Sequence, residues 1–302
     1  MMSKVGWIGL GAMGAPMARV VAGAGHSVTA FDVDPGRSAA LAGDGVVAAP
    51  SAAAAAVGAD VLAVMVATPT QAASALFGED GAAAALAPGS VVLMMATVGA
   101  AAVSTWSVQL AGRGISVVDA PVSGGTARAA AGDLLMMVGG APEDIVKVAS
   151  LLDAMASSAP VVGPRPGDGQ KLKLVNQLLC GVHIAAAAEA LVFAESLGLD
   201  AAGSWEVVRQ GAAASFMLDD RGRRMVEGTF GDVKSALDIF VKDMGLVVDA
   251  AGSSKARTAL AEAAQKAFQM GTEAGYGRRD DSSVILVYRE LLRQQQSSAS
   301  QA

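Results

Sequence analysis

The stretch VGWIGLGAMGAPMARVVAGAGHSVTAFD, residues 5–32, decides how the N-terminal half of this chain is expected to fold. Its hydrophobic pattern predicts a strand over residues 5–10, a helix over 12–23 and a second strand over 27–32. The glycines between the first strand and the helix follow G-x-G-x-x-G spacing, and Asp32 closes the second strand about 20 residues further on. This context predicts a dinucleotide-binding turn, in which the backbone approaches a pyrophosphate at the helix N-terminus.

The predicted turn assigns cofactor contacts to Gly9, Leu10, Gly11, Ala12, Met13 and Gly14. Asp32 is placed to accept hydrogen bonds from the adenosine ribose, and its charge would repel a 2'-phosphate, so NAD is favoured over NADP. Arg37 is close enough in sequence to weaken this preference, so NADP remains possible. The alternative for Asp32 is a solvated turn residue beside Asp34 and Pro35.

The rest of the chain predicts an α/β domain followed by a helical one. Further strands are expected over residues 61–66, 90–95 and 115–119, a rhythm typical of a Rossmann-type, doubly wound, mostly parallel sheet. Near residue 165 several Pro and Gly residues interrupt the pattern, and helical periodicity follows. We therefore expect an NAD-binding domain over 1–165 and an all-α domain over 166–302, joined by a long helix over about 169–197.

Composition excludes several classes of protein. The 302 residues are 53% hydrophobic and 17% charged, which suits a globular protein with a large core. The net charge of -6, without a basic stripe, argues against nucleic-acid binding. One cysteine and two histidines make a disulfide or a metal centre improbable and suit a reducing compartment. The start does not read as a signal peptide, and the apolar runs read as too short or too interrupted to span a membrane, so a cytoplasmic location is expected.

A second motif, DAPVSGGT, occupies residues 119–126 directly after a predicted strand. Ser123 offers a hydroxyl, and Gly124 and Gly125 offer unobstructed backbone N–H groups, which together could hold a small carboxylate. The alternative is a glycine-rich turn that binds no ligand.

A third motif opens the long helix and contains two lysines. At about 100° per residue, Lys173 and Gln177 fall on one apolar face, whereas Lys171 points away from it. A lysine in an apolar cleft has a lowered pKa, which suits a proton acceptor or donor near neutral pH. Lys173 is therefore the candidate for catalysis, and Lys171 is expected to be solvated. Core packing is the expected role of Cys180 and His183 on the same helix.

Three segments together resemble the β-hydroxyacid dehydrogenase family, which includes 3-hydroxyisobutyrate dehydrogenase and tartronate semialdehyde reductase. They are GLGAMGAPMA at 9–18, DAPVSGG at 119–125 and the pattern G-x-G-Q-x-x-K-x-x-N at 167–176. The segments occur in the family's order and cover nearly the whole chain. Within the family, residues 175–190 look most like the L-threonate dehydrogenase branch.

The resemblance implies a function and a set of residue roles. The chain would oxidise the hydroxyl of a small anionic hydroxy acid by hydride transfer to NAD, with Lys173 as general base and acid. Substrate contacts would come from Ser123, Gly124, Gly125, Asn176 and Gln177, and further cofactor contacts from Val66, Ala67, Thr97 and Lys242. Many family members place Asn four residues after the lysine, where this chain has Gln177, which predicts a differently shaped or longer substrate.

Three other functions stay open. The same site could reduce a small semialdehyde such as tartronate semialdehyde. An imine reductase would share the cofactor domain but generally lacks a lysine at position 173, and a non-catalytic scaffold would be expected to lose that lysine or the Ser-Gly-Gly segment.

The long helix also predicts self-association. Its Ala-rich stretch, residues 185–190, reads as an outer apolar face, so we expect a homodimer or homotetramer. The alternative is a monomer whose C-terminal helices cover that face.

Overall fold

The computed structural model describes residues 2–301, with side chains described through residue 298, and forms two compact units, Met1–Lys173 and Leu174–Ala302. The division falls inside the long helix α8 (Asp168–Ser196), later than the Pro- and Gly-rich junction near residue 165. The first turn of α8 belongs to the first unit because it is hydrogen-bonded to Asp119 at the end of a strand. The assignment of domains to 1–165 and 166–302 stays a prediction.

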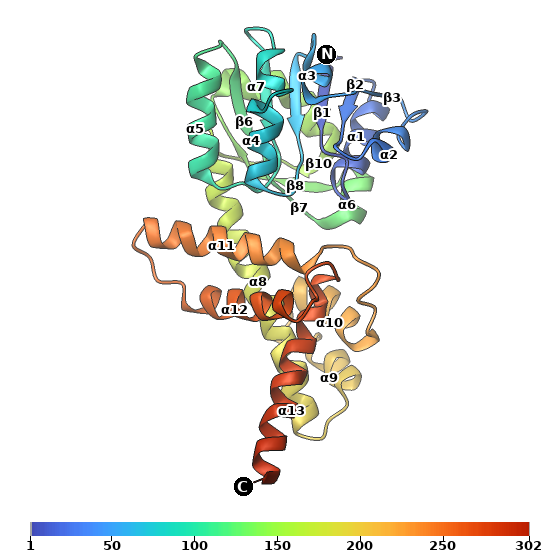
Figure 1. Ribbon diagram of the computed structural model, residues 1–302, viewed down its shortest axis with the longest axis vertical. Coiled ribbons are helices and arrows are strands. Elements are labelled where there is room, and N and C mark those ends of the chain that lie inside the picture. Colours follow the sequence, from blue (N-terminus) through green and yellow to red (C-terminus); the bar gives the residue numbers. More distant parts are fainter. Residues whose placement is uncertain (1, 302) are drawn as a thin grey trace. The chain divides into compact units, whose positions relative to one another are not determined.

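The first unit contains a mostly parallel sheet with helices on both faces (Figure 1). Its strand order is β11-β9-β6-β5-β4-β1-β2-β3, and the run from β3 to β6 is the doubly wound order of dinucleotide-binding folds. The strands are β1 (Lys4–Ile8), β2 (Ser27–Phe31), β3 (Val46–Ala48), β4 (Val61–Val64), β5 (Val91–Met94), β6 (Ser116–Asp119), β9 (Val138–Gly139) and β11 (Val161–Gly163). A small second sheet pairs β10 (Ala156–Ser158), β8 (Leu134–Met136) and β7 (Val122–Ser123).

Helices of the first unit bury apolar residues against each face of the main sheet. Met17 and Leu151 lie in the core on one face, and Leu76 and Leu110 lie in the core on the other. The helices are α1 (Gly14–Gly23), α2 (Pro35–Ala39), α3 (Ala52–Ala56), α4 (Pro69–Phe77), α5 (Ala100–Ala111), α6 (Gly125–Ala131) and α7 (Pro142–Met155), with a 3-10 turn η1 (Ala82–Ala84). Strands buried on both faces explain the near-continuous apolar runs of the sequence.

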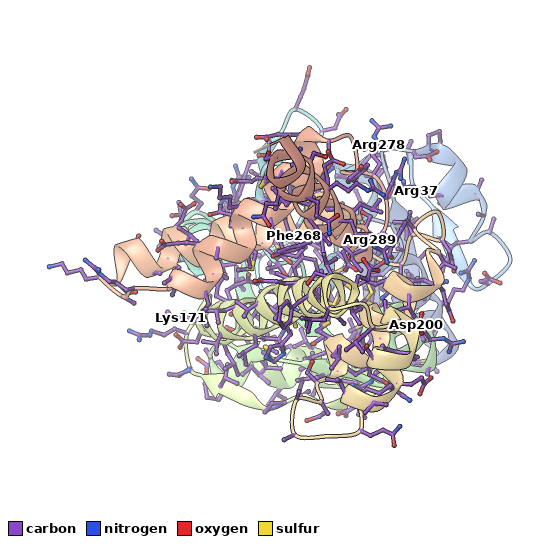
Figure 2. All side chains as sticks on the ribbon, turned by 90° about the horizontal axis from the view of Figure 1, so that it is seen from below. Arg37, Lys171, Asp200, Phe268, Arg278 and Arg289 are labelled. Atoms are coloured by element: carbon purple, nitrogen blue, oxygen red, sulfur yellow. The ribbon has the colours of Figure 1, made fainter. Side chains whose placement is uncertain are left out.

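The second unit is helical, with the greater part of α8 in its core. Phe268 is fully buried and stacks on Phe240 with ring centroids 5.2 Å apart, and Figure 2 shows it among the packed side chains. The remaining elements are α9 (Ala201–Val208), α10 (Phe216–Glu227), α11 (Leu237–Ser253), α12 (Ala259–Glu273), the 3-10 turn η2 (Asp281–Val284) and α13 (Ile285–Gln301). The predicted Rossmann-type sheet and all-α second part are both confirmed.

Two expectations about α8 need correction. Ala187 and Ala188 lie in the core of the second unit, so the stretch 185–190 is not an outer face, although Ala186 and Ala190 are exposed. The helix is also long and apolar enough to cross a membrane, contrary to the expectation of interrupted runs. Its central residues, such as Ile184 and Leu191, pack against other helices of the second unit, which accounts for its apolar composition without a membrane.

Candidate active site

The predicted site residues of the first unit follow the carboxyl ends of parallel strands. Such ends meet at one edge of the sheet, which is where doubly wound folds bind ligands. In chain order, Gly9 follows β1, Asp32 follows β2, Val66 and Ala67 follow β4 and Thr97 follows β5, whereas Ser123 ends β7 of the second sheet, shortly after β6. The topology therefore brings these separate motifs to the same edge.

The turn between β1 and α1 has two glycines that the fold requires. Gly9 has a φ of +95°, and a Cβ there would lie 2.3 Å from the Met65 carbonyl oxygen. A Cβ on Gly14 would lie 2.0 Å from the Gly9 carbonyl oxygen. Gly11 differs, because a Cβ there would meet only Arg37 Nη1, at 3.8 Å. The turn is thus closely packed on its inner side and open at Gly11, which suits a pyrophosphate at the start of α1.

Asp32 is a buried carboxylate that holds the glycine turn against the end of β2. Its Oδ2 accepts a hydrogen bond from Leu10 N at 2.7 Å, and its Oδ1 accepts one from Asp34 N at 2.9 Å. Only 8% of the residue is exposed, so the alternative of a solvated turn residue is wrong. Arg37 Nη1 lies 3.7 Å from Asp32 Oδ2, so an exposed cation stands beside the carboxylate that would select the ribose.

The Ser-Gly-Gly segment lies where β7 ends and α6 begins. Ser123 is half-buried, whereas Gly125 is exposed and has open space where a Cβ would stand. Gly124 precedes the first residue of α6, so the backbone N–H groups that follow are at a helix start and need partners. The segment could thus accept a small carboxylate.

The two lysines of α8 occupy different environments, as helical geometry predicts. Lys173 is 6% exposed. The side chain of Lys171, which Figure 2 labels, is 59% exposed. The Lys171 Nζ lies 2.6 Å from Asp168 Oδ1. The expected burial of Lys173 and the expected solvation of Lys171 are both confirmed.

The amides that follow Lys173 belong to a hydrogen-bonded network within the second unit. Gln177 Nε2 donates to Asp243 Oδ2 at 2.5 Å, and Gln177 Oε1 accepts from Asn176 Nδ2 at 2.8 Å. The other Asp243 oxygen lies 2.8 Å from Lys242 Nζ. The structure therefore connects three residues that the sequence proposes separately, Asn176, Gln177 and Lys242, through a buried aspartate to which sequence analysis gave no role.

No role was predicted from the sequence for two further buried polar residues, although both lie inside the motifs described above. Asp119 and Gln170 each have no exposed surface. The Asp119 carboxylate accepts hydrogen bonds from Gly167 N and Gln170 N, each at 2.7 Å, at the start of α8. Burial raises the pKa of Asp119 to about 6, and the two N–H donors offset part of that effect. The signal available in the sequence was an acidic residue directly at the end of an apolar strand.

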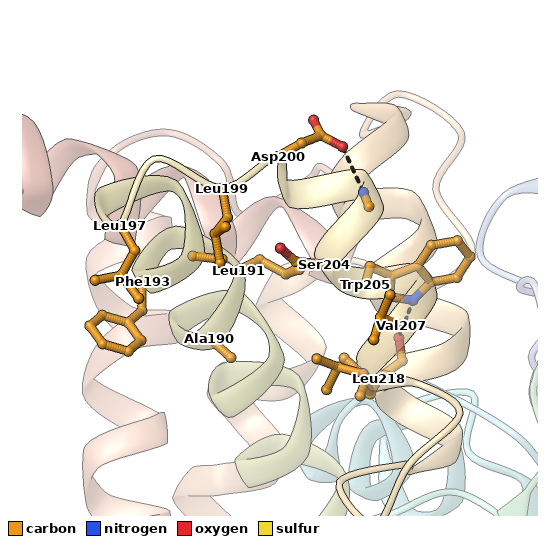
Figure 3. Close-up of a pocket in the computed structure, with 13 residues that line it drawn as sticks. Ala190, Leu191, Phe193, Leu197, Leu199, Asp200, Ser204, Trp205, Val207 and Leu218 are labelled. Atoms are coloured by element: carbon orange, nitrogen blue, oxygen red, sulfur yellow. Dashed lines mark hydrogen bonds between the residues drawn. The ribbon is translucent and has the colours of Figure 1, made fainter.

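The second unit also has an apolar groove (Figure 3). The polar residues described above are not among those that line it. The end of α8 and the helices α9 and α10 line it with Phe193, Leu197, Leu199, Trp205, Val207 and Leu218, among others. Asp200 stands at its margin, where the carboxylate accepts a hydrogen bond from Gly203 N at the start of α9. The lining offers little chemistry and is instead suited to apolar contact.

Comparison with family models matches nearly the whole chain. Residues 4–163 match the NAD-binding domain of 6-phosphogluconate dehydrogenase, and residues 167–288 match the model described as the NAD-binding part of NADP-dependent 3-hydroxyisobutyrate dehydrogenase. The boundary between the two matched segments lies just before α8.

Individual proteins are similar over the same length. An L-threonate dehydrogenase of Cupriavidus necator is 40% identical over 95% of this chain and 97% of its own. A 3-hydroxyisobutyrate dehydrogenase structure from Salmonella typhimurium has a TM-score of 0.88 and 38% identity, covering 94% of this chain and 99% of its own. The Mycobacterium tuberculosis 3-hydroxyisobutyrate dehydrogenase with L-serine has a TM-score of 0.84 and 30% identity, covering 96% of this chain and 100% of its own.

The raised pKa of Asp119 predicts a pH-dependent stability. Between pH 4 and 6 the folded chain keeps the Asp119 proton, whereas the unfolded chain, with an ordinary pKa of 3.8, loses it. The free energy of unfolding should therefore fall as pH rises through this window, by about 2–3 kcal/mol from this group. Urea unfolding at several pH values should show the wild type losing stability relative to an Asp119→Asn variant between pH 4 and 7. A constant difference would contradict the shift.

Proposed function

Because the chain belongs to the 3-hydroxyisobutyrate dehydrogenase-like family of β-hydroxyacid dehydrogenases, and so is an NAD-dependent oxidoreductase acting on CH–OH groups, we propose that it oxidises a small hydroxy acid of the L-threonate type with Lys173 as its general base. One observation carries the role of Lys173. It is the buried lysine of a helix whose other N-terminal lysine is exposed. A buried amine is suited to proton transfer when a substrate hydroxyl is held beside it.

The proposed roles follow the chemistry of alcohol oxidation. The bound nicotinamide supplies the acceptor for the hydride. Lys173 Nζ takes the hydroxyl proton during oxidation and returns it in the reverse direction. Ser123 and the N–H groups of Gly124 and Gly125 hold the substrate carboxylate, so that the neighbouring hydroxyl is presented to the lysine.

The cofactor roles rest on the geometry of the sheet edge. The open side of Gly11 and the start of α1 suit the pyrophosphate, with Leu10, Ala12 and Met13 supplying backbone around it. Asp32 would bind the ribose with the lone pairs that Leu10 N and Asp34 N leave unused. Val66, Ala67 and Thr97 would line the path to the nicotinamide, and Lys242 would contribute from α11.

Selection among hydroxy acids is assigned to Asn176 and Gln177. The oxygen and the nitrogen of the Gln177 side-chain amide both have partners within the chain. Its substrate contact would therefore come from the second N–H of Nε2. Asn176 is less buried and stands beside it. Gln177 would therefore shape the substrate side mainly by holding Asp243 and Asn176 in place.

A cytoplasmic location, with NAD and a reduced Cys180, belongs to the same proposal.

Reduction of a semialdehyde uses the same groups in reverse, so it is a direction of the proposed reaction rather than a separate site. The test is a panel of small hydroxy acids and semialdehydes, including L-threonate, 3-hydroxyisobutyrate, L-serine and tartronate semialdehyde, followed by NADH absorbance. We expect L-threonate or a close analogue to give the highest kcat/KM. No turnover on any member would contradict the proposal.

Replacement of Lys173 should abolish proton transfer without removing the cofactor site. We expect Lys173→Met to lower kcat by about 10²–10⁴-fold, with NADH affinity changed only a few-fold. The matched control is Lys171→Met, which changes an exposed lysine two residues away and should keep wild-type kcat. A Lys173→Met enzyme that retains most of its turnover would show that another group moves the proton.

Replacement of Asp32 should weaken the preference for NAD. Asp32→Asn keeps an acceptor for Leu10 N but removes the charge that repels a 2'-phosphate. We expect the ratio of kcat/KM for NAD to that for NADP to fall about tenfold or more. Asp34→Asn, whose side chain is 57% exposed, serves as the control. An unchanged ratio in the Asp32→Asn enzyme would count against the ribose contact.

Self-association is assigned to a stripe along α8. Apolar side chains recur at Val175, Leu179, Val182, Ala186, Ala190, Phe193 and Leu197, with successive spacings of four, three, four, four, three and four residues. Most of these are exposed, including Phe193 at 62% and Leu197 at 61%. Such spacing is that of a seam between paired helices, so a second copy of this chain is the proposed partner. The groove of Figure 3 continues this surface, because Phe193 and Leu197 also line it.

Light scattering tests this assembly. The wild-type mass should be two or four times the 30.0 kDa of one chain, and Phe193→Glu with Leu197→Glu should shift it toward one chain. Val108→Glu, an equally drastic change at a 74% exposed residue of α5, should leave the mass unchanged. A wild-type mass of a single chain would contradict the proposal.

A further inference from the structure

Gln170 connects the first turn of α8 to the loop after β5 through three buried hydrogen bonds. Its Oε1 accepts from Val98 N at 3.0 Å and from Gly99 N at 3.1 Å, and its Nε2 donates to the Ala96 carbonyl oxygen at 3.0 Å. The bonded groups stand immediately before and after Thr97. One side chain of α8 thus holds the backbone on both sides of the residue assigned to the nicotinamide.

Asp119 fixes the same helical turn to the neighbouring strand. Its carboxylate accepts from Gly167 N and from the backbone N of Gln170 itself. These are N–H groups that a helix start leaves without partners, so the bonds determine where α8 begins relative to β6. Gln170 is therefore held by its backbone to β6 and by its side chain to the loop after β5.

Close approach makes this arrangement specific. A Cβ at Gly169 would lie 2.1 Å from the Met137 carbonyl oxygen, so the turn before Gln170 packs directly on backbone. A displacement of α8 by a fraction of an ångström would break bonds or create clashes. Lys173 follows Gln170 by three residues, nearly one helical turn, and its position is set by the same contacts.

We propose that Gln170 is a positioning residue, which fixes the loop around Thr97 and the side chain of Lys173 in one arrangement and so sets the geometry for hydride and proton transfer. The inference rests on the proposed function for the roles of Lys173 and Thr97. Misplacement of reacting groups by about 1 Å can cost about 10²-fold in rate, so a residue that touches no substrate can still control kcat.

Two variants remove different numbers of the Gln170 hydrogen bonds, so their effects on kcat should differ. Gln170→Leu removes all three side-chain bonds, whereas Gln170→Glu keeps the acceptor for Val98 N and Gly99 N and loses the donor to Ala96 O. Counting sites by NADH binding, we expect kcat per site to fall about 30–100-fold in Gln170→Leu and less in Gln170→Glu, with the NADH dissociation constant changed less than about threefold. Gln170→Glu also supplies the result if Gln170→Leu fails to fold.

A matched control separates positioning from stability. Ser90→Ala removes another buried side-chain bond, from Ser90 Oγ to the Ala59 carbonyl oxygen, just before the opposite end of β5. It should lower the unfolding temperature while leaving kcat per NADH-binding site at the wild-type value. Wild-type kcat per site in both Gln170 variants overturns the inference, because Gln170 would then contribute to stability alone.

Chemical labelling tests the placement of Lys173 without a substrate. Competitive acetylation followed by mass spectrometry gives the labelling rate of Lys173 relative to that of exposed Lys171 in the same peptide region. We expect this ratio to rise several-fold in the Gln170 variants and to stay at the wild-type value in Ser90→Ala. An unchanged ratio in the Gln170 variants overturns the inference. If the wild type turns over no substrate, the proposed function fails on its own, and the ratio still decides whether Gln170 holds Lys173.

Discussion

The hydrogen bonds from the start of α8 to the Asp119 carboxylate are the constraint on which the candidate site depends. A buried carboxylate is costly, and here two N–H groups with no helical partners offset part of that cost. The strand end and the helix start each satisfy the other. Because the helix then carries Lys173, a requirement of backbone chemistry becomes the reference point for the lysine that we propose as general base.

Two other buried carboxylates also hold neighbouring parts of the chain in place. Asp32 holds the glycine turn through Leu10 N, and Asp243 contacts Gln177 and Lys242 within the helical unit. Asp32 and Asp243 therefore each hold neighbouring groups of the chain through hydrogen bonds to their carboxylates. Acids used in this way cannot be replaced by apolar residues without leaving buried donors unpaired.

Much of the first unit could be predicted from the sequence, because its strands are long apolar runs with clear breaks. The predicted helix over 169–197 and the observed Asp168–Ser196 differ by one residue at each end. Short strands such as β7, which has two residues, could not be predicted. A hydrophobic alternation cannot be recognised in so few residues. The Ala-rich stretch was misplaced for another reason, since alanine suits the exposed and the buried face of a helix equally.

The site was predictable where a single side chain carries the signal and not where the signal is a contact between distant segments. Helical geometry separated Lys173 from Lys171 correctly. The bonds of Gln170 join residues more than 70 positions apart, and its place in the motif at 167–176 does not indicate which distant backbone groups it binds.

Gly11 illustrates a different kind of information in the glycine turn. Gly9 and Gly14 are required by the packing of the chain on itself, whereas a methyl group at position 11 would meet no neighbour closer than 3.8 Å. A survey of folded stability would therefore score position 11 as tolerant, and under the proposed cofactor site only a survey that includes the cofactor would register a requirement for glycine there. The proposed cofactor site thus puts two selective pressures side by side in this turn, one exerted by the chain on itself and one exerted by a molecule from outside it.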